Sequence, residues 1–180
     1  SASRGTAMHK FLEHHVLGTG YEDLTLIGNE ARPMANKIIE VGLTPVEEYY
    51  GSEVMLHYPG LYAGSTDLIC LHNSKETVVD FKQSNRPKKE EWIEDYYLQI
   101  AAYAMAHDYV YGSKIEQGVI MVCTPDLYYQ EFKVEGLQLR KRKHQFLKRL
   151  DMYNELIHDE KERAKVNPDE LLKEFEKDGK

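Results

Sequence analysis

The sequence predicts a single α/β domain in which helices flank a mixed central sheet. Three observations support this fold class. The length of 180 residues suits one domain. Helical patterns occur near the start, in the middle and towards the end of the chain, and five runs typical of strands lie between them. The shares of 42% hydrophobic and 29% charged residues are ordinary for a globular protein.

The first half predicts two helices followed by three strands. The helices are expected at Gly5 to about Leu17 and at about Glu30 to Val41, the second starting at Pro33, because proline is favoured in a first helical turn. A polar stretch, 72–75, fits a hairpin loop between the second and third strands. The expected strands of this half are 45–58, 61–71 and 77–82.

The second half predicts helix, two strands and helix. The clearest helix runs from Lys89 to about Tyr111 and is stopped by Gly112. Strands at 115–123 and 127–134 and a long helix at 136–165 follow. We place the domain at 1–166, because Asn167-Pro168-Asp169 breaks the last helix, and expect a charged tail or short helix at 167–180.

Composition excludes several classes of protein. No apolar run is long enough to cross a membrane, and no secretory leader pattern opens the chain. Two cysteines, Cys70 and Cys123, cannot supply the four thiolates of an iron–sulfur cluster and are expected to be buried free thiols. A reducing, intracellular compartment is therefore expected, and we favour the cytoplasm over the mitochondrion.

The charge distribution favours a local anion site. The net charge of −7 argues against a generally basic nucleic-acid coat protein. Basic residues nevertheless gather at 86–89 and at 140–149, where a phosphate chain could be held. The alternative for 140–149 is the solvated face of a long helix.

An acid-x-Lys pattern ends the third expected strand. Asp80 and Lys82 are two residues apart, so their side chains project from the same face of that strand. A carboxylate beside an ammonium can hold a hard cation and a phosphate together. The pattern occurs four times in the chain, and surface ion pairing is the ordinary explanation for any one occurrence.

The surroundings single out this occurrence. Asp67, in Gly64-x-x-Asp67, lies on the preceding strand, so a hairpin would bring it close to Asp80, and a divalent cation would relieve the repulsion. Gln99 and Tyr103 lie four residues apart on the clearest helix. Trp92 and Tyr96 would share their face, where core packing is the alternative role. A buried Gln99 would need a partner.

Four motifs in this order resemble the RecB-like nucleases of the PD-(D/E)XK superfamily, which have a restriction-endonuclease-like fold. The motifs are Gly5-x-x-x-His9, Gly64-x-x-Asp67, Asp80-x-Lys82 and Gln99-x-x-x-Tyr103. Within that superfamily the chain looks most like the mitochondrial genome maintenance exonuclease and related phage and bacterial exonucleases. Segments 79–84, 86–88 and 98–103 carry this closer likeness, which spans about residues 5–125.

The resemblance implies a role for each matched residue. His9, Asp67, Asp80 and the backbone carbonyl of Phe81 would be metal ligands. Lys82 would orient or help to deprotonate the attacking water, Gln99 would position the site, and Tyr103 would contact the nucleic acid. Glu53 or Glu48 could supply the further carboxylate that the family often carries on the strand before Gly-x-x-Asp.

These features predict a metal-dependent DNA exonuclease, active on single-stranded DNA in repair, recombination or replication. One or two Mg²⁺ or Mn²⁺ ions are expected as cofactors. The expected DNA contacts are Tyr103, Arg86, Lys88, Lys89, Trp92, Tyr96, Arg140 and Lys143. A flap-cutting or other endonuclease, a silent DNA-binding module, and the nuclease domain of a larger helicase–nuclease remain as alternatives. We expect a monomer, with a helicase or a replication or recombination factor as a conceivable partner.

Overall fold

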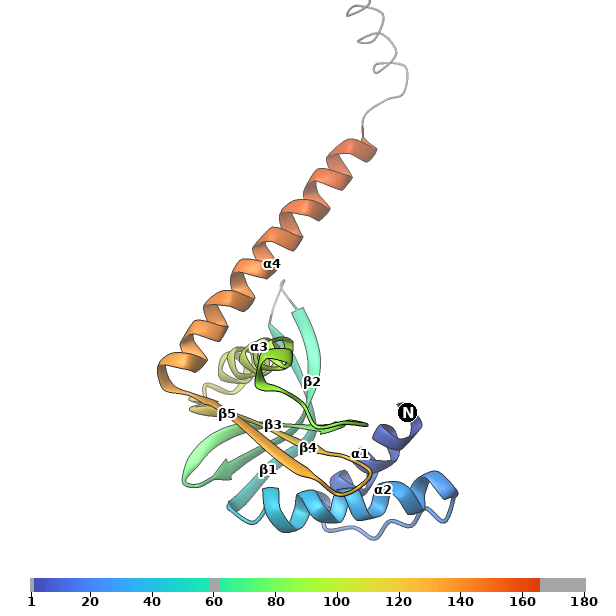
Figure 1. Ribbon diagram of the computed structural model, residues 1–180. Coiled ribbons are helices and arrows are strands. Elements are labelled where there is room, and N and C mark those ends of the chain that lie inside the picture. The colour runs from blue at the N-terminus through green and yellow to red at the C-terminus, as the bar shows by residue number, and fades with distance from the viewer. Residues whose placement is uncertain (1, 59–61, 166–180) are drawn as a thin grey trace, which may run out of the picture. The chain divides into compact units, whose positions relative to one another are not determined.

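The computed structural model describes residues 2–58 and 62–165 and contains a five-stranded sheet. The strands follow the chain order β1-β2-β3-β4-β5 across the sheet (Figure 1). They are β1 (Val46–Tyr58), β2 (Tyr62–His72), β3 (Lys75–Gln83), β4 (Gln117–Cys123) and β5 (Tyr129–Glu135). β3 and β4 pair in parallel, whereas the other neighbours are antiparallel. The expected mixed sheet is thus confirmed.

Helices cover both faces of this sheet (Figure 1). One face packs against α1 (Ala2–Leu17), α2 (Leu26–Lys37) and the π-helix η1 (Ile38–Gly42), and the other against α3 (Glu94–Tyr111). The strands alternate between the two cores: Leu68 and Val79 lie with the first set of helices, whereas Ile69 and Val78 lie with α3. By the same alternation, Asp80 and Lys82 lie on the face of Val78, towards α3.

The β2–β3 hairpin is tighter than the sequence predicted. Instead of a four-residue loop at 72–75, the turn consists of Asn73 and Ser74, and His72 pairs with Lys75. The φ angles of Asn73 (48°) and Ser74 (64°) are both left-handed, as a two-residue hairpin turn requires. This turn fixes the register of the two strands that carry the acidic residues.

The predicted start of the second helix at Pro33 is wrong. α2 begins at Leu26, because Thr25 caps it: its Oγ1 accepts the Gly28 N–H at 3.0 Å. Asp23 in turn accepts hydrogen bonds from the backbone N–H and the hydroxyl of Thr25. Pro33 therefore lies inside the helix, where the cap and the burial of Met34 outweigh its missing N–H.

The start of the central helix also differs from the prediction. Lys89 precedes a short 3₁₀ turn, η2 (Glu90–Trp92), and α3 starts only at Glu94. Ile93 lies between them with φ −109° and ψ 18°, fully buried, so its anchoring in the core breaks the helical path. Trp92 therefore does not share a helical face with Tyr96. The predicted stop at Gly112 is confirmed, with φ 64°.

The chain divides into two compact units, residues 1–146 and 147–180. The long helix α4 (Gly136–Ala164) spans the division, so its first turns belong to the unit that contains the sheet. The described part of the second unit is helical and largely exposed. The expected tail or short helix at 167–180 lies outside the described residues. Within the described part, no helix is long and apolar enough to cross a membrane.

Candidate active site

Asp67 and Asp80 meet where β2 and β3 stop pairing. The last paired residues are Leu68 and Val79, and the next position on each strand carries one of the two acids. There Asp67 Oδ2 accepts the Phe81 N–H at 2.7 Å. Burial raises the pKa of Asp67 far above its usual range, and the hydrogen bond and negative charge of Asp80 raise it further. The predicted approach of the two carboxyl groups is confirmed.

Lys82 joins this acidic pair to α3. Its Nζ lies 3.0 Å from Asp80 Oδ2 and donates to Gln99 Oε1 at 3.5 Å. Gln99 Nε2 donates in turn to the Tyr103 hydroxyl at 2.9 Å, so the Gln99 amide is not left unpaired. The ring centroid of Tyr96 lies 4.7 Å from Lys82 Nζ. Burial lowers the pKa of Lys82, but the charge and contact of Asp80 outweigh this and raise it overall.

Gly64, the glycine of the Gly-x-x-Asp motif, makes room for Tyr103. A Cβ atom at position 64 would lie 3.0 Å from Tyr103 Cε1, closer than side chains ordinarily approach. A bare backbone at this point of β2 therefore lets the phenol ring reach its place beside Gln99. Within the Gly-x-x-Asp motif, Gly64 thus makes room for Tyr103, whereas Asp67 contacts Asp80.

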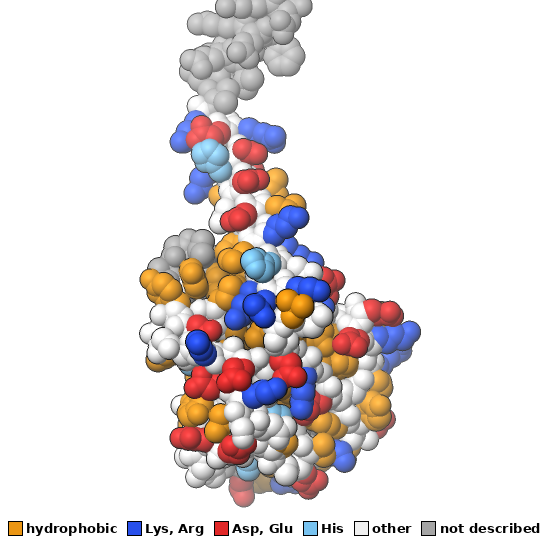
Figure 2. Space-filling model, turned by 90° about the vertical axis from the view of Figure 1, so that its left-hand side faces the viewer, with side chains coloured by type: hydrophobic (Ala, Val, Ile, Leu, Met, Phe, Trp, Pro, Cys, Tyr) orange, Lys and Arg blue, Asp and Glu red, His pale blue; other side chains and the backbone are white. Residues whose placement is uncertain are grey.

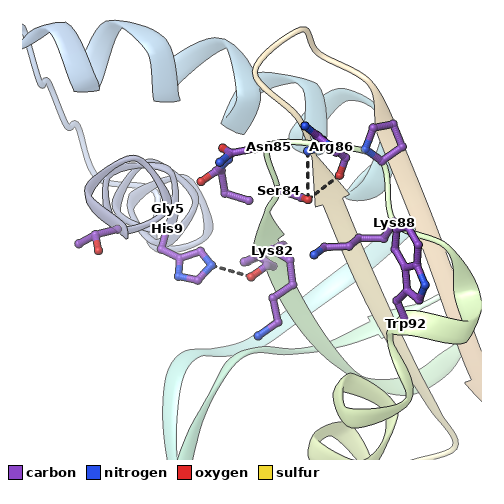
Figure 3. Close-up of a pocket in the computed structure, with 12 residues that line it drawn as sticks. Gly5, His9, Lys82, Ser84, Asn85, Arg86, Lys88 and Trp92 are labelled. Carbon is purple, nitrogen blue, oxygen red and sulfur yellow. Dashed lines mark hydrogen bonds between the residues drawn. The ribbon is translucent and has the colours of Figure 1, made fainter. Parts of the chain in front are cut away.

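His9 approaches the same point from α1 (Figure 3). Its Nε2 lies 2.6 Å from the Phe81 carbonyl oxygen, to which it donates, and 3.8 Å from Asp67 Oδ2. The carbonyl can only accept, so this nitrogen carries the proton in that contact. Three of the groups predicted as metal ligands therefore converge from α1, β2 and β3.

Glu53 is the third acidic group to reach the site. β1 pairs Ser52 with Leu68 and Val54 with Thr66, which sets Glu53 opposite Asp67. Its φ of 49° is left-handed, a strained conformation for a residue other than glycine. Burial raises the pKa of Glu53 overall, although the charge of His9 and a hydrogen bond with Asp67 partly oppose this. Glu48, the other candidate, pairs with Leu71 and lies further along the sheet.

The donor set fits a hard divalent cation. Asp80 Oδ2 is buried without a hydrogen-bond partner, since its contact with Lys82 is an ion pair that lacks hydrogen-bond geometry. Two buried carboxylates also repel each other, which a cation would relieve. Within residues 2–58 and 62–165, no group of three His, Cys, Asp or Glu side chains is arranged so that it could hold a metal ion. If His9 is one of the ligands, its Nε2 would have to release the Phe81 carbonyl, because a ring nitrogen that donates a hydrogen bond cannot also bind an ion.

A cavity of about 730 Å³ opens beside these residues (Figure 3). It is lined by His9 and Lys82 and, from the loop that follows β3, by Arg86 and Lys88. Trp92 closes another side and is 60% exposed, which excludes the alternative of core packing. Lys89 lies over the Trp92 ring, with Nζ 5.0 Å from its centroid. Arg86, Lys88, Lys89 and Trp92, four of the predicted DNA contacts, are thus gathered near Lys82.

Arg140 and Lys143 are not brought to this site. They line a separate cavity of about 520 Å³ with Lys75, Glu116 and Glu135, at the opposite end of β3. A cluster of basic residues in the sequence does not indicate at which end of the sheet those residues will lie. Conversely, no pattern in the sequence indicated Gln130, whose side chain hydrogen-bonds to the backbone of Lys88, 42 residues away.

Comparison with known proteins shows the fold. A candidate exonuclease from Eubacterium rectale superposes with a TM-score of 0.60 at 13% identity, covering 91% of this chain and 69% of that one. An alkaline exonuclease from Laribacter hongkongensis aligns over 88% of this chain and 85% of its own at 14% identity, but the TM-score of 0.34 is too low to indicate a shared fold. No protein-family model and no curated protein matches the chain. The first likeness shows that this chain has the fold of a solved candidate exonuclease.

Proposed function

We propose that this protein is a metal-dependent deoxyribonuclease that hydrolyses phosphodiester bonds from an end of single-stranded DNA. The observation that carries the proposal is the continuous set of contacts from Asp67 and Asp80 through Lys82 and Gln99 to Tyr103. Surface ion pairing would not need a buried carboxylate pair or an amide bridge. The fold shared with a candidate exonuclease agrees with this reading.

The metal would be held by Asp67 and Asp80, with His9 and the Phe81 carbonyl close enough to complete the set and Glu53 as a further acid. Oxygen donors with one imidazole suit Mg²⁺ or Mn²⁺. When bound, such an ion lowers the pKa of a water molecule and stabilises negative charge on a phosphate. The protein supplies a preformed, largely buried pair of carboxylates for it, with the Asp80 side chain only 7% exposed.

Lys82 would offset the charge that develops on the phosphate. Its ammonium sits between the Asp80 carboxylate and the Gln99 amide, with the Tyr96 ring beside it, so its position is fixed before substrate arrives. Gln99 and Tyr103 act as positioning residues: the phenol orients the amide, and the amide orients the ammonium. Preorganised donors of this kind require little rearrangement during reaction.

The family-level proposal rests on the motif residues. Gly5, His9, Gly64, Asp67, Asp80, Lys82, Gln99 and Tyr103 stand in the order of the RecB-like nucleases. Each of the matched side chains with a chemical role lies within or beside one contact network. On this basis we propose that the protein belongs with the RecB-like exonucleases and acts in DNA repair, recombination or replication.

A test of the proposal compares linear and circular single strands. Linear DNA labelled at one end and a circular strand of the same sequence are incubated with Mg²⁺, Mn²⁺ or a chelator. The proposal predicts loss of the linear strand in metal alone, and survival of the circle. Asp67→Asn removes one carboxylate at nearly constant shape and is expected to abolish the loss.

Three results would count against the proposal. Cutting of the circle would show an endonuclease on the same site. Binding of DNA without cutting in either metal would show a silent binding module. Unchanged cutting by Asp67→Asn would show that the hydrolytic site lies elsewhere.

A further inference from the structure

The cavity beside Lys82 has an unusual charge. Among the described residues that line it, none is Asp or Glu, whereas Lys82, Arg86 and Lys88 all contribute. On the face of the molecule shown in Figure 2, by contrast, basic and acidic side chains are interspersed. The whole chain carries a net charge of −7, so the positive charge of this cavity is opposite in sign to that of the protein as a whole. A cavity of about 730 Å³ is of the size that small-molecule ligands occupy, and its charge selects an anion.

The loop that carries two of these cations is held in place. Ser84 Oγ donates to the Arg86 carbonyl and accepts the Arg86 N–H at 3.4 Å (Figure 3). Gln130 on β5 clamps Lys88 from both sides: its Oε1 accepts the Lys88 N–H at 2.6 Å, and its Nε2 donates to the Lys88 carbonyl at 2.8 Å. These contacts hold the backbone of residues 84–88 in place, so the loop loses less conformational entropy when it binds a ligand.

The charged ends of that loop are available. Within residues 2–58 and 62–165, neither the Arg86 guanidinium nor the Lys88 ammonium has an ion-pair or hydrogen-bond partner. Two other basic side chains, by comparison, are paired: Lys75 with Glu135 at 2.6 Å and Arg142 with Glu94 at 3.4 Å. Two unpaired cations on one braced loop are suited to a phosphate.

Trp92 supplies an aromatic surface in the same cavity. It is 60% exposed, and the 3₁₀ turn η2 holds it outside the helix. Lys89 Nζ lies 5.0 Å from the centre of its ring. An exposed indole beside phosphate-binding cations offers a stacking surface for a nucleic-acid base.

We propose that the cavity formed with Arg86, Lys88 and Trp92 binds one phosphate-bearing nucleotide beside the bond to be cut. The base stacks on Trp92, and the phosphate lies between the guanidinium of Arg86 and the ammonium of Lys88. That this nucleotide neighbours a scissile bond rests on the proposed function, because Lys82 belongs to both sites. The binding itself needs no catalysis and can be measured alone.

Trp92 is the only tryptophan of the chain, so it reports directly on this cavity. Full-length protein in chelator is titrated with thymidine, thymidine 5′-monophosphate or thymidine 3′-monophosphate, and tryptophan fluorescence is excited beyond the absorption of the bases. We expect saturable quenching by at least one monophosphate, and binding of that monophosphate at least about tenfold tighter than binding of thymidine, since charged hydrogen bonds are at stake.

A pair of double variants separates this cavity from general basic charge. Arg86→Ala with Lys88→Ala is expected to weaken monophosphate binding by about tenfold or more. Arg140→Ala with Lys143→Ala removes the same charge from the cavity at the other end of β3 and is expected to leave binding unchanged. Thermal unfolding of both variants confirms that they are folded, which the exposure of Arg86 and Arg140 favours.

The outcomes distinguish this proposal from the proposed function. Absence of saturable quenching, equal binding of thymidine and both monophosphates, or equal weakening by the two double variants would each overturn the nucleotide site. Saturable, phosphate-dependent binding by a protein that cuts no DNA would support the site while removing the nuclease. Cutting of DNA without any nucleotide-dependent fluorescence would do the reverse.

Discussion

Two acid-Phe-Lys triplets of this chain can be compared directly. Asp80-Phe81-Lys82 lies on β3 in the middle of the sheet, and Glu131-Phe132-Lys133 lies on the edge strand β5. The first has a buried acid, 7% exposed, and an N–O separation of 3.0 Å. In the second the acid is 25% exposed, the lysine is 41% exposed and the separation is 3.5 Å. Identical spacing therefore produces two different environments.

The phase of each strand accounts for the difference. Phe132 packs in the core below α3, so Glu131 and Lys133 point to the opposite face of the sheet at its edge. Phe81 packs in the other core, so Asp80 and Lys82 point towards α3. There Lys82 contacts Gln99, which is hydrogen-bonded to Tyr103. A second acid, Asp67 on the neighbouring strand β2, lies against Asp80 of the first triplet. The comparison shows that burial and partners, not the triplet, make the candidate site.

The largest contrast is expected when each acid loses its charge. Asp80→Asn removes a carboxylate that faces Asp67 and Lys82, and we expect cleavage of single-stranded DNA to fall by at least about 100-fold, as on loss of a group that stabilises a charged transition state. Glu131→Gln is the matched control, and its activity should equal that of the wild type. Initial rates on end-labelled DNA in saturating metal measure both. Similar losses in the two variants would remove the distinction between the triplets.

A second contrast concerns metal binding rather than activity. Divalent cations should raise the free energy of unfolding of the wild type by about 2.7 kcal/mol at a concentration 100 times the dissociation constant. Asp67→Asn should lose this increment and, in chelator, be as stable as the wild type or more stable, because a neutral amide avoids both the cost of burying a carboxylate and the repulsion from Asp80. Thermal or urea unfolding with and without Mn²⁺ checks this. An equal increment in Asp67→Asn would place the cation elsewhere.

A smaller effect is expected from Gly64→Ala. The added methyl group would press on Tyr103 at 3.0 Å, which we expect to cost about 1–3 kcal/mol of stability and to lower activity by displacing the phenol from Gln99. The double variant Gly64→Ala with Tyr103→Leu removes the clash and should recover stability without recovering activity. Denaturant unfolding together with the cleavage assay distinguishes the two effects. Additive stability losses would show that the ring and the glycine do not interact.

The smallest effect is expected at the edge-strand triplet. Lys133→Ala breaks an exposed ion pair with Glu131, and such pairs contribute less than about 1 kcal/mol. The free energy of unfolding should therefore change little, and less at high salt. A loss of several kcal/mol in urea unfolding would mean that the second triplet is structurally as important as the first.

Much of this site could be predicted from the sequence, because its parts follow local rules. Alternation along a strand places Asp80 and Lys82 on one face, and a short polar loop predicts the hairpin that brings Asp67 to Asp80. Helical spacing similarly pairs Gln99 with Tyr103. These contacts lie within one element or between adjacent strands, where spacing fixes geometry.

Contacts between distant elements could not be predicted in the same way. The clamp of Gln130 on Lys88 joins residues 42 apart, and no pattern in the sequence announces it. The placement of Arg140 and Lys143 depends on where α4 starts at the end of β5, which charge clustering does not reveal. Trp92 does not lie on the helical face that the sequence predicted, because the buried Ile93 interrupts the helix between Trp92 and Glu94.

The difference between the two triplets is tested most directly by replacing the lysine of each with alanine. Lys82→Ala, Lys133→Ala and the wild type are compared on end-labelled single-stranded DNA in Mg²⁺ and in Mn²⁺, with unfolding curves to show that each is folded. We expect metal-dependent cleavage that disappears in Lys82→Ala and is unchanged in Lys133→Ala. Cleavage that survives in folded Lys82→Ala, or that is lost equally in both variants, would contradict this expectation.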